Sequence, residues 1–490
     1  MQRKHPATYR HRPLCLLLLA FLFLLWLVWH ALSLWRLPVR GRPRRSGQAA
    51  ARTLPSLAAG LRVYLLTHEL SLSGAPRVCV ELAQLLQASG ARVTLVVGEG
   101  FDGSLPSDAE LVARAGRLLG SAPAFAVRGD RVARGGPWWQ WWRSLGWVGD
   151  SWELQQAAAA DVVVVSTAIP RHIAWLADFR ALAPGHGGLL WWVHEGATVM
   201  GQFPPHVTRA AADAQQRPGL LNALVFPSHS TLAWWQGATA ALQASGQLPP
   251  PPPALSLPAP AVVHWGWPAW RAQQPLPTGA AAAQQRQALG LAPTDFVFLT
   301  LAAFTPLKGH PGIVRAFQRA QQLCGSGSSS GSGRALRLVL AGDNGRAEAP
   351  FFSLGAQDPA IQLLPPHSSP AALLGAADAY VSNTQGGGET WGLAILDALG
   401  SGTPVLASRT GAVGEMLEHG STALLHSVGE GVSASGVEEA EELAGNMCRV
   451  VGEEGLRQGL AARGRAHVAL HFGQQQMEAQ LVQALAALLA

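Results

Sequence analysis

The sequence contains few cysteines and few charged side chains. Of its 490 residues, 48% are hydrophobic and only 13% are Asp, Glu, Lys or Arg. The four cysteines are Cys15, Cys79, Cys324 and Cys448. No two of them have the spacing of a metal or redox pair, so we expect unpaired thiols and no disulfide framework. The aliphatic composition is that of a globular protein, and the length is sufficient for two domains.

Acidic residues are absent from the first 52 positions, which contain ten Lys and Arg residues. The whole chain has 36 basic and 30 acidic residues, which leaves 26 basic against 30 acidic ones in the remainder. The remainder therefore has a net charge of −4, although the whole chain is basic. This balance argues against a surface that binds polyanions, and we expect no nucleic-acid partner.

An apolar run near the N-terminus covers Leu14–Trp35, interrupted only by His30 and Ser33. It is long enough to span a bilayer as a helix. We predict a single-pass type II signal-anchor, with residues 1–13 as a cytoplasmic tail, 36–58 as a stem and the folded part in the ER or Golgi lumen. A cleaved signal peptide is the alternative, because Ala31-Leu32-Ser33 could serve as the cleavage site.

A glycine-rich loop lies between a predicted strand, Ala377–Ser382, and a helical pattern that begins near Trp391. The loop contains the consecutive glycines Gly386, Gly387 and Gly388. Free N–H groups and the positive dipole end of a helix at this point favour an anion such as a diphosphate. Taken alone, glycines also serve the tight turns of any βαβ unit.

Two acidic residues flank the start of the same helix. Glu389 lies in the loop, and Asp397 lies about two helical turns further on, with seven residues between them. A following strand, Pro404–Ala407, leads to a second loop, 408–411. Both loops fall at the carboxyl-end rim where open α/β sheets bind ligands.

This stretch resembles the E-x7-E signature of the retaining family 4 glycosyltransferases, E-G-F-G-x4-E-A followed by G-x-P-V. The matching positions are Glu389, Gly392, Ala398, Gly402, Pro404 and Val405. Three positions depart from the pattern: Trp391 replaces Phe, Thr390 replaces Gly, and Asp397 replaces the second Glu.

The resemblance implies roles for the donor side of the site. Glu389 would contact the donor sugar and Asp397 the ribose, while the loop from Gly386 to Gly392 would hold the diphosphate. Lys308, in the motif K-G-H, would clamp the diphosphate. The arginine of the family pattern is replaced by Ala303. We expect Arg409, at a position where the family usually has aspartate, to be one source of the missing positive charge.

The first half of the chain begins with a βαβ pattern: the strand Leu61–Leu66, a small-residue loop, the helix Arg77–Ala88 and the strand Arg92–Val97. The resemblance implies that Ser73, Gly74 and Ala75 in this loop face the other domain. A further strand, Leu189–Val193, ends in His194 and Glu195. The resemblance points His194 at the transferred sugar, and we assign Glu195 to the acceptor side.

The fold class implied is α/β, in the GT-B arrangement of two Rossmann-like domains that face each other across a cleft. Residues 59–275 would form the acceptor domain and 276–490 the donor domain, with a final helix that crosses back. A tryptophan cluster, 138–147, interrupts the βα alternation. We interpret it as a buried satellite core, with a carbohydrate platform or a membrane-facing surface as alternatives.

The motifs HELSLSGAP, WWVHE and TQGGGETWG resemble a plant and algal group of membrane-anchored family 4 enzymes. That resemblance implies transfer of a hexose-type sugar from a UDP or GDP donor to a glycan, lipid or protein acceptor, with retention. No D-x-D motif occurs, and we expect neither a metal ion nor a cofactor. A non-catalytic nucleotide-sugar binder, a partner subunit and a UDP-sugar isomerase are the alternatives.

Overall fold

The computed structural model describes most of the chain after residue 52. The described residues are 53–71, 73–98, 106–129, 152–250, 257–268, 271, 279–325, 333–342, 358–365, 370–428 and 437–489. The predicted anchor, Leu14–Trp35, and the tryptophan cluster, 138–147, lie outside these residues. None of the helices in the described ranges combines the length and hydropathy that a membrane span requires.

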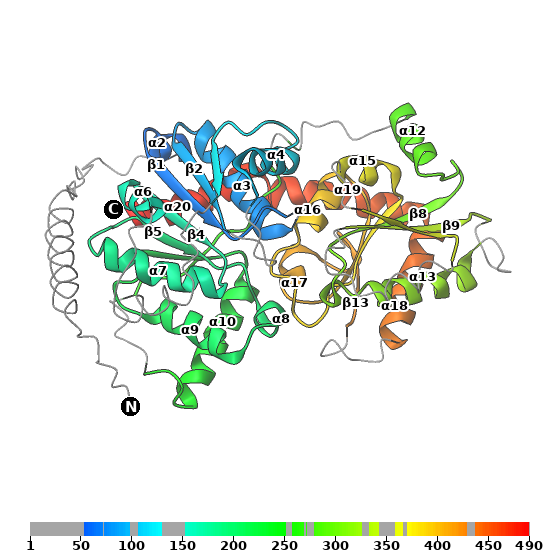
Figure 1. Cartoon of the computed structure of the whole chain (residues 1–490). Helices are drawn as coiled ribbons and strands as arrows, with labels where there is room; N and C mark the ends of the chain where they lie inside the picture. The colour runs from blue at the N-terminus through cyan, green and yellow to red at the C-terminus, as the bar shows by residue number, and fades with distance from the viewer. Residues whose placement is uncertain are drawn as a thin grey trace, which may run out of the picture. The chain divides into compact units, whose positions relative to one another are not determined.

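A seven-stranded parallel sheet forms the part that we call the N-terminal domain (Figure 1). Its order is β3-β2-β1-β4-β5-β6-β7. The strands are β1 Arg62–Thr67, β2 Arg92–Val97, β3 Ala126–Gly129, β4 Val162–Ser166, β5 Leu189–Trp192, β6 Ala223–Phe226 and β7 Ala261–Val262. Strands such as β4 are buried along their whole length, because helices cover both faces of a parallel sheet.

A six-stranded parallel sheet forms the C-terminal domain, in the order β10-β9-β8-β11-β12-β13. The strands are β8 Phe296–Leu301, β9 Leu336–Ala341, β10 Ile361–Leu364, β11 Ala379–Ser382, β12 Val405–Ser408 and β13 Leu424–His426. In both sheets the order reverses beside the first strand of the domain. Such a switch point is where open α/β sheets place ligands.

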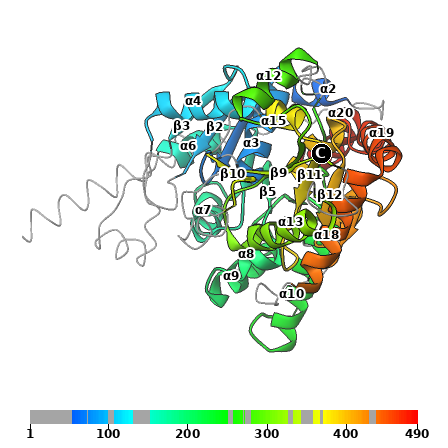
Figure 2. The same ribbon diagram turned by 90° about the vertical axis from the view of Figure 1, so that its right-hand side faces the viewer.

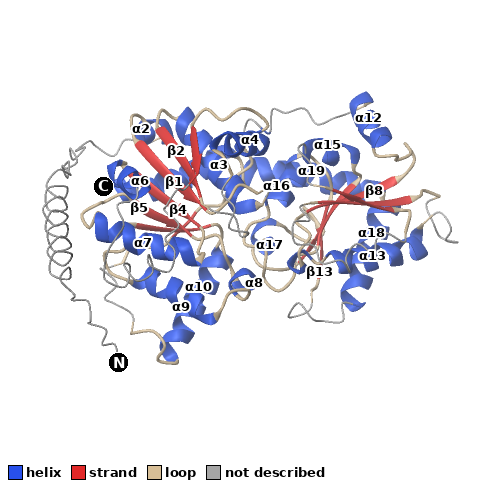
Figure 3. Cartoon of the chain, in the orientation of Figure 1, coloured by secondary structure: helices blue, strands red, loops and turns tan. Residues whose placement is uncertain are grey.

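Helices alternate with the strands in both domains (Figure 3). Those of the N-terminal domain are α2 Leu54–Ala58, α3 Gly74–Ala88, α4 Asp108–Leu119, α6 Trp152–Ala159, α7 Pro170–Leu182, α8 Ala197–Met200, α9 Pro205–Gln216 and α10 His229–Ala244. Those that follow are α12 Ala280–Ala288, the short η2 Pro306–Lys308, α13 His310–Cys324, α15 Pro370–Ala376, α16 Leu393–Gly400, α17 Val413–Met416, α18 Val437–Gly452, α19 Glu454–His471 and α20 Gln474–Leu489.

The last helix, α20, packs on the N-terminal domain. Its Gln480 side chain accepts a hydrogen bond of 2.8 Å from the backbone N–H of His264. Its residues Leu481, Leu485 and Leu488 share one hydrophobic core with Leu54 and other residues of the first domain. The C-terminal end of the chain therefore completes the core of the N-terminal domain.

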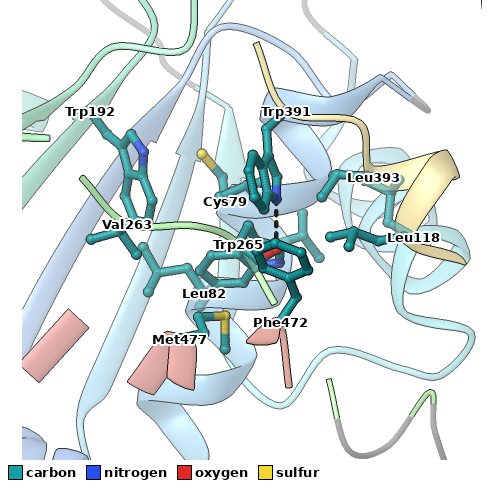
Figure 4. Close-up of a cluster of buried hydrophobic side chains, with 14 of the residues drawn as sticks. Cys79, Leu82, Leu118, Trp192, Val263, Trp265, Trp391, Leu393, Phe472 and Met477 are labelled. Carbon is teal, nitrogen blue, oxygen red and sulfur yellow. Dashed lines mark hydrogen bonds between the residues drawn. The ribbon is translucent and has the colours of Figure 1, made fainter. Parts of the chain in front are cut away.

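A group of aromatic and aliphatic side chains also joins the two domains (Figure 4). Trp192 of β5 and Trp265 pack in the same core as Trp391, Leu393 and Phe472. The Trp391 indole N–H donates to the carbonyl of Trp265 at 2.7 Å. The hydrophobic core is thus continuous from one domain to the other.

The expectation of unpaired thiols is wrong for two cysteines. Cys324 and Cys448 form a disulfide with a Cα–Cα distance of 5.7 Å, whereas Cys79 is buried and free. The partners are 124 residues apart in sequence. They meet because α13 and α18 lie side by side, as Figures 1 and 2 show from two directions. Spacing along the chain could not reveal this pair.

Candidate functional site

Lys308 and Glu389 meet at the carboxyl-end rim of the second sheet. Lys308 ends η2 just after β8, and its Nζ donates to Glu389 Oε2 at 3.0 Å. Thr384, which follows β11, donates its hydroxyl to the same oxygen at 2.9 Å. Glu389 is 9% exposed. The structure therefore brings two predicted catalytic residues into direct contact, although they lie on different loops.

Gly309 explains how these two loops can approach so closely. Its φ of +60° ends η2 and begins α13, and an added Cβ would lie 2.2 Å from the carbonyl oxygen of Asn383. A side chain would clash with this backbone atom, and the left-handed conformation itself favours glycine. The loop that carries Lys308 thus packs directly against the loop that leads to Glu389.

The loop 386–392, which we call the donor loop, owes its shape to its three consecutive glycines. Gly386 and Gly387 have φ angles of +56° and +72°, and a Cβ at Gly388 would lie 2.2 Å from Leu307 Cδ1. The N–H of Gly387 donates to Thr410 Oγ1 at 2.7 Å, and that of Gly388 donates to the Gln385 carbonyl at 2.9 Å. Both amides are bonded within the protein in this structure, and their contact with a diphosphate stays a prediction.

The donor loop contacts the segment that follows β5 in the N-terminal domain. The Thr198 hydroxyl donates to the Gly386 carbonyl. A Cβ added at Gly196 would lie 2.9 Å from Thr390 Cγ2, so the two backbones pass close together. Gly196 directly follows His194 and Glu195. These two predicted site residues of the N-terminal domain therefore lie in a segment next to the donor loop.

The start of α3 lies opposite the start of α16. Ser73 is the N-cap residue of α3, and its hydroxyl accepts a hydrogen bond of 2.9 Å from the Ser71 hydroxyl. A Cβ at the exposed Gly74 would lie 3.9 Å from Leu393 Cδ1, at the first residue of α16. The structure therefore places these two predicted residues beside the helix that follows the signature loop.

His194 and Glu195 form a polar end to β5. Burial, and to a lesser degree the charge of His68, lower the pKa of His194 to about 3. Its ring stacks on Trp192 with centroids 5.6 Å apart, and within the described part of the chain its Nε2 has no hydrogen-bond partner. Burial raises the pKa of Glu195, whose Oε2 accepts from the Ala168 N–H at 2.6 Å.

Asp397 has partners other than those expected. Both of its oxygens accept from the Arg77 guanidinium of α3, at 2.6 and 2.9 Å. Arg271 lies 3.7 Å from the same carboxylate. Burial alone would raise the pKa of Asp397, but the charges of Arg77 and Arg271 outweigh it and lower the pKa. The expected ribose contact therefore competes with an ion pair between the two domains.

Glu81 completes this cluster, which we call the interdomain clasp: Arg77, Glu81, Arg271 and Asp397. Glu81 Oε1 accepts from Arg77 at 2.9 Å and from Arg271 at 2.9 Å, and Glu81 Oε2 accepts from the Trp265 indole at 2.6 Å. The four charged side chains are between 1% and 14% exposed. Two guanidinium groups and two carboxylates thus neutralise each other in a buried position.

Three further residues with predicted donor contacts have distinct settings. Trp391 is 6% exposed and stacks on His264 at 4.5 Å, so its side chain belongs to the interdomain core. The N–H of Gly392 points to Met416 Sδ at 3.4 Å. Both positions are buried in packing, and their direct contact with the donor stays a prediction. Arg409 is exposed at the end of β12 and is the predicted substitute cation.

Sequence reasoning overlooked the clasp and the contact of Thr198. Arg77 and Glu81 are one helical turn apart in a helix whose other residues are largely apolar, which is a detectable signal. Their partner Asp397 is 320 residues from Arg77 in sequence, and nothing in the sequence indicates that pairing. In the described residues, no group of three His, Cys, Asp or Glu side chains is suited to a metal ion.

Comparison with known proteins agrees with this architecture. Residues 282–460 match the family model of glycosyl transferases group 1, and residues 59–128 match that of glycosyl-transferase family 4. No curated protein is significantly similar in sequence.

Several solved structures have the same fold. HepE of Anabaena, solved in complex with UDP and glucose, superposes with a TM-score of 0.63 at 17% identity over 87% of this chain and 99% of its own. Sucrose-phosphate synthase of Thermosynechococcus elongatus superposes with a TM-score of 0.59 at 15% identity, over 86% of this chain and 98% of its own. WaaG, a glycosyltransferase involved in lipopolysaccharide biosynthesis, gives 0.57 at 15% identity over the same shares.

The two sheets, their switch points and these matches define a glycosyltransferase of the GT-B type. Within that class, the two matched segments support a family 4 glycosyltransferase. The predicted GT-B fold, with its two parallel-sheet α/β domains, is thereby confirmed, and the family models support the predicted family.

Proposed function

We propose that this protein is a retaining glycosyltransferase that transfers a hexose-type sugar from a UDP or GDP donor to a glycan, lipid or protein acceptor. The structures of HepE with UDP and glucose and with UDP-glucose support a nucleotide-sugar donor. The resemblance to the plant and algal group supports retention and a membrane anchor.

The contact between Lys308 and Glu389 carries the proposal. It places an ammonium and a carboxylate together at the rim, beside the segment that begins with His194. Lys308 would exchange Glu389 for the donor diphosphate and stabilise the charge that develops on the leaving group. Glu389, once released, would accept hydrogen bonds from the sugar hydroxyls. The exposed Arg409 would supply a second positive charge, so that we expect no metal ion and no cofactor to be needed.

The disulfide supports a lumenal location. Disulfides persist in the secretory pathway and are rare in the cytosol, and Cys324–Cys448 joins two helices of the donor domain. Together with the apolar run Leu14–Trp35, this favours a type II membrane protein with its catalytic part in the ER or Golgi lumen.

The test is release of UDP or GDP from nucleotide sugars, with and without added acceptors, by the chain and by two variants. We expect Lys308→Ala and Glu389→Gln each to lower turnover at least a hundredfold, as loss of one transition-state contact commonly does, while the thermal melting curve stays close to that of the parent. Normal turnover in either variant would refute the assignment of that residue to the donor site. Addition of EDTA should leave turnover unchanged.

A non-catalytic nucleotide-sugar binder is the second candidate, and the interdomain clasp is the observation that favours it. Asp397 is held by Arg77, and the family arginine is replaced by Ala303. In that case UDP would bind with a measurable Kd, but no donor would release nucleotide.

A further inference from the structure

A buried carboxylate on α18 holds the loop that leads to the donor site. Glu439 is 8% exposed, and its Oε1 accepts from Asn383 Nδ2 at 2.6 Å and from Gln385 Nε2 at 2.9 Å. No Lys or Arg side chain of the described residues forms an ion pair with it. Charge-assisted hydrogen bonds are stronger than neutral ones. This carboxylate therefore fixes two amide side chains in place of pairing with a cation.

The orientation of the Asn383 amide is set by its other partners. Its Oδ1 can only accept, and His426 Nε2 lies 2.7 Å from it, so the imidazole carries its proton on Nε2. Its Nδ2 also donates to the Gly309 carbonyl at 3.1 Å. The hydrogen bond to Glu439 thus connects α18 with the residue that directly follows Lys308.

The direction of successive side chains explains what Glu439 controls. Asn383 and Gln385 both reach Glu439, whereas Thr384 between them donates to Glu389. Side chains alternate from one side of an extended backbone to the other. Glu439 therefore holds the residues on both sides of Thr384, and Thr384 presents its hydroxyl to the opposite side, where Glu389 and Lys308 meet.

The helix that carries Glu439 is itself firmly attached. A Cβ added at Gly312 near the start of α13 would lie 3.1 Å from Glu439 Oε1, and Cys324 at the end of α13 is bonded to Cys448 of α18. The two helices thus run in the same direction, approach closely near their starts and are joined by the disulfide near their ends. Glu439 therefore lies where α18 packs closely against α13.

We propose that Glu439 is a positioning residue of the donor site, which holds the 383–385 segment so that Lys308 and Glu389 stay aligned for the nucleotide sugar. The proposal rests on the proposed function for the identity of the ligand. It adds a residue from outside the signature, on α18.

Hydrogen exchange of the full chain, followed by mass spectrometry, tests the loop directly. Glu439→Ala should speed exchange of the backbone amides of 384–389 about tenfold, which corresponds to the loss of one hydrogen bond of moderate strength. Glu439→Gln, which keeps one acceptor oxygen, should show a smaller increase. Glu438→Gln is the matched control, because Glu438 is exposed and precedes Glu439 on the same helix. Equal exchange in Glu439→Ala and the parent would overturn the proposal.

Affinity for UDP provides the second readout, measured by calorimetry. Glu439→Ala should raise the Kd about tenfold, and it should have no further effect in a Lys308→Ala background, because it acts through that residue. Additive losses in the double variant would overturn the positioning role.

The same data separate this proposal from the proposed function. If the parent chain binds neither UDP nor GDP and releases no nucleotide, the donor assignment fails. Faster exchange confined to 384–389 in Glu439→Ala would then still support control of the loop by Glu439, and uniform exchange changes over both domains would refute it.

Discussion

At the scale of single residues, the site depends on glycines that let two loops pass close together. Gly309 is the sharpest case, since its missing side chain leaves room for the Asn383 carbonyl. Lys308 precedes it and reaches Glu389 only because the chain turns at this point. Gly309 therefore helps to set the position of Lys308.

Gly309→Ala should lower both stability and donor turnover. The added Cβ would meet a backbone oxygen at 2.2 Å, and the φ of +60° is unfavourable for alanine. We expect a loss of about 1–3 kcal/mol, the range for a residue held in a strained backbone conformation, with the upper end favoured by the contact with the loop. Urea denaturation measures the first effect, and nucleotide release measures the second.

Gly219→Ala is the matched control. Its φ is +74°, but nothing lies within 4 Å of the added Cβ. It should cost only the backbone strain of about 1 kcal/mol and leave turnover unchanged. Equal losses in the two variants would show that contact with Asn383 is unimportant.

At the scale of elements, strands with long apolar runs were predictable from the sequence, and very short strands were not. Strands such as β4 and β8 are buried along nearly their whole length, so their hydrophobic sequence indicates them directly. β3, with the sequence AVRG, and β13, with three residues, lack this signal and form only by pairing with a neighbour. The helix after the donor loop begins at Leu393, two residues later than Trp391, because Trp391 turns into the interdomain core.

The disulfide between α13 and α18 should contribute measurable stability. Replacing Cys324 and Cys448 with serine should lower the free energy of unfolding by about 2–4 kcal/mol, because the bond closes a loop of 124 residues. Urea denaturation with and without dithiothreitol measures it. The reductant should destabilise the parent and leave the double serine variant unaffected; a parent insensitive to reduction would contradict the pairing.

At the scale of the whole molecule, the two domains are held together by charge as well as by hydrophobic packing. The interdomain clasp connects α3 with α16, and Glu415 of α17 accepts hydrogen bonds from the N–H groups of His229 and Ser230 at the start of α10. Sequence spacing placed Asp397 on a helix near Glu389 but could not supply its partner. Only the folded chain brings Arg77 to it.

Asp397→Asn should weaken the association of the domains. Breaking a buried ion pair from one side costs about 3 kcal/mol or more, since Arg77 and Arg271 would stay buried with Glu81 as their single shared carboxylate. Asp161→Asn is the control, because Asp161 pairs with Arg62 at the surface, where the side chains are 36% and 53% exposed. It should cost less than about 1 kcal/mol. Urea denaturation compares the two, and equal effects would show that the clasp is not stabilising.

The return of α20 to the N-terminal domain has a consequence for biosynthesis. Leu54 and Leu57 share a hydrophobic core with Leu481, Leu485 and Leu488, which are synthesised after the strands of both sheets. Domains generally fold in the order of synthesis. Here the first domain to emerge must wait, with part of its apolar surface open to solvent or chaperones, until α20 has been made.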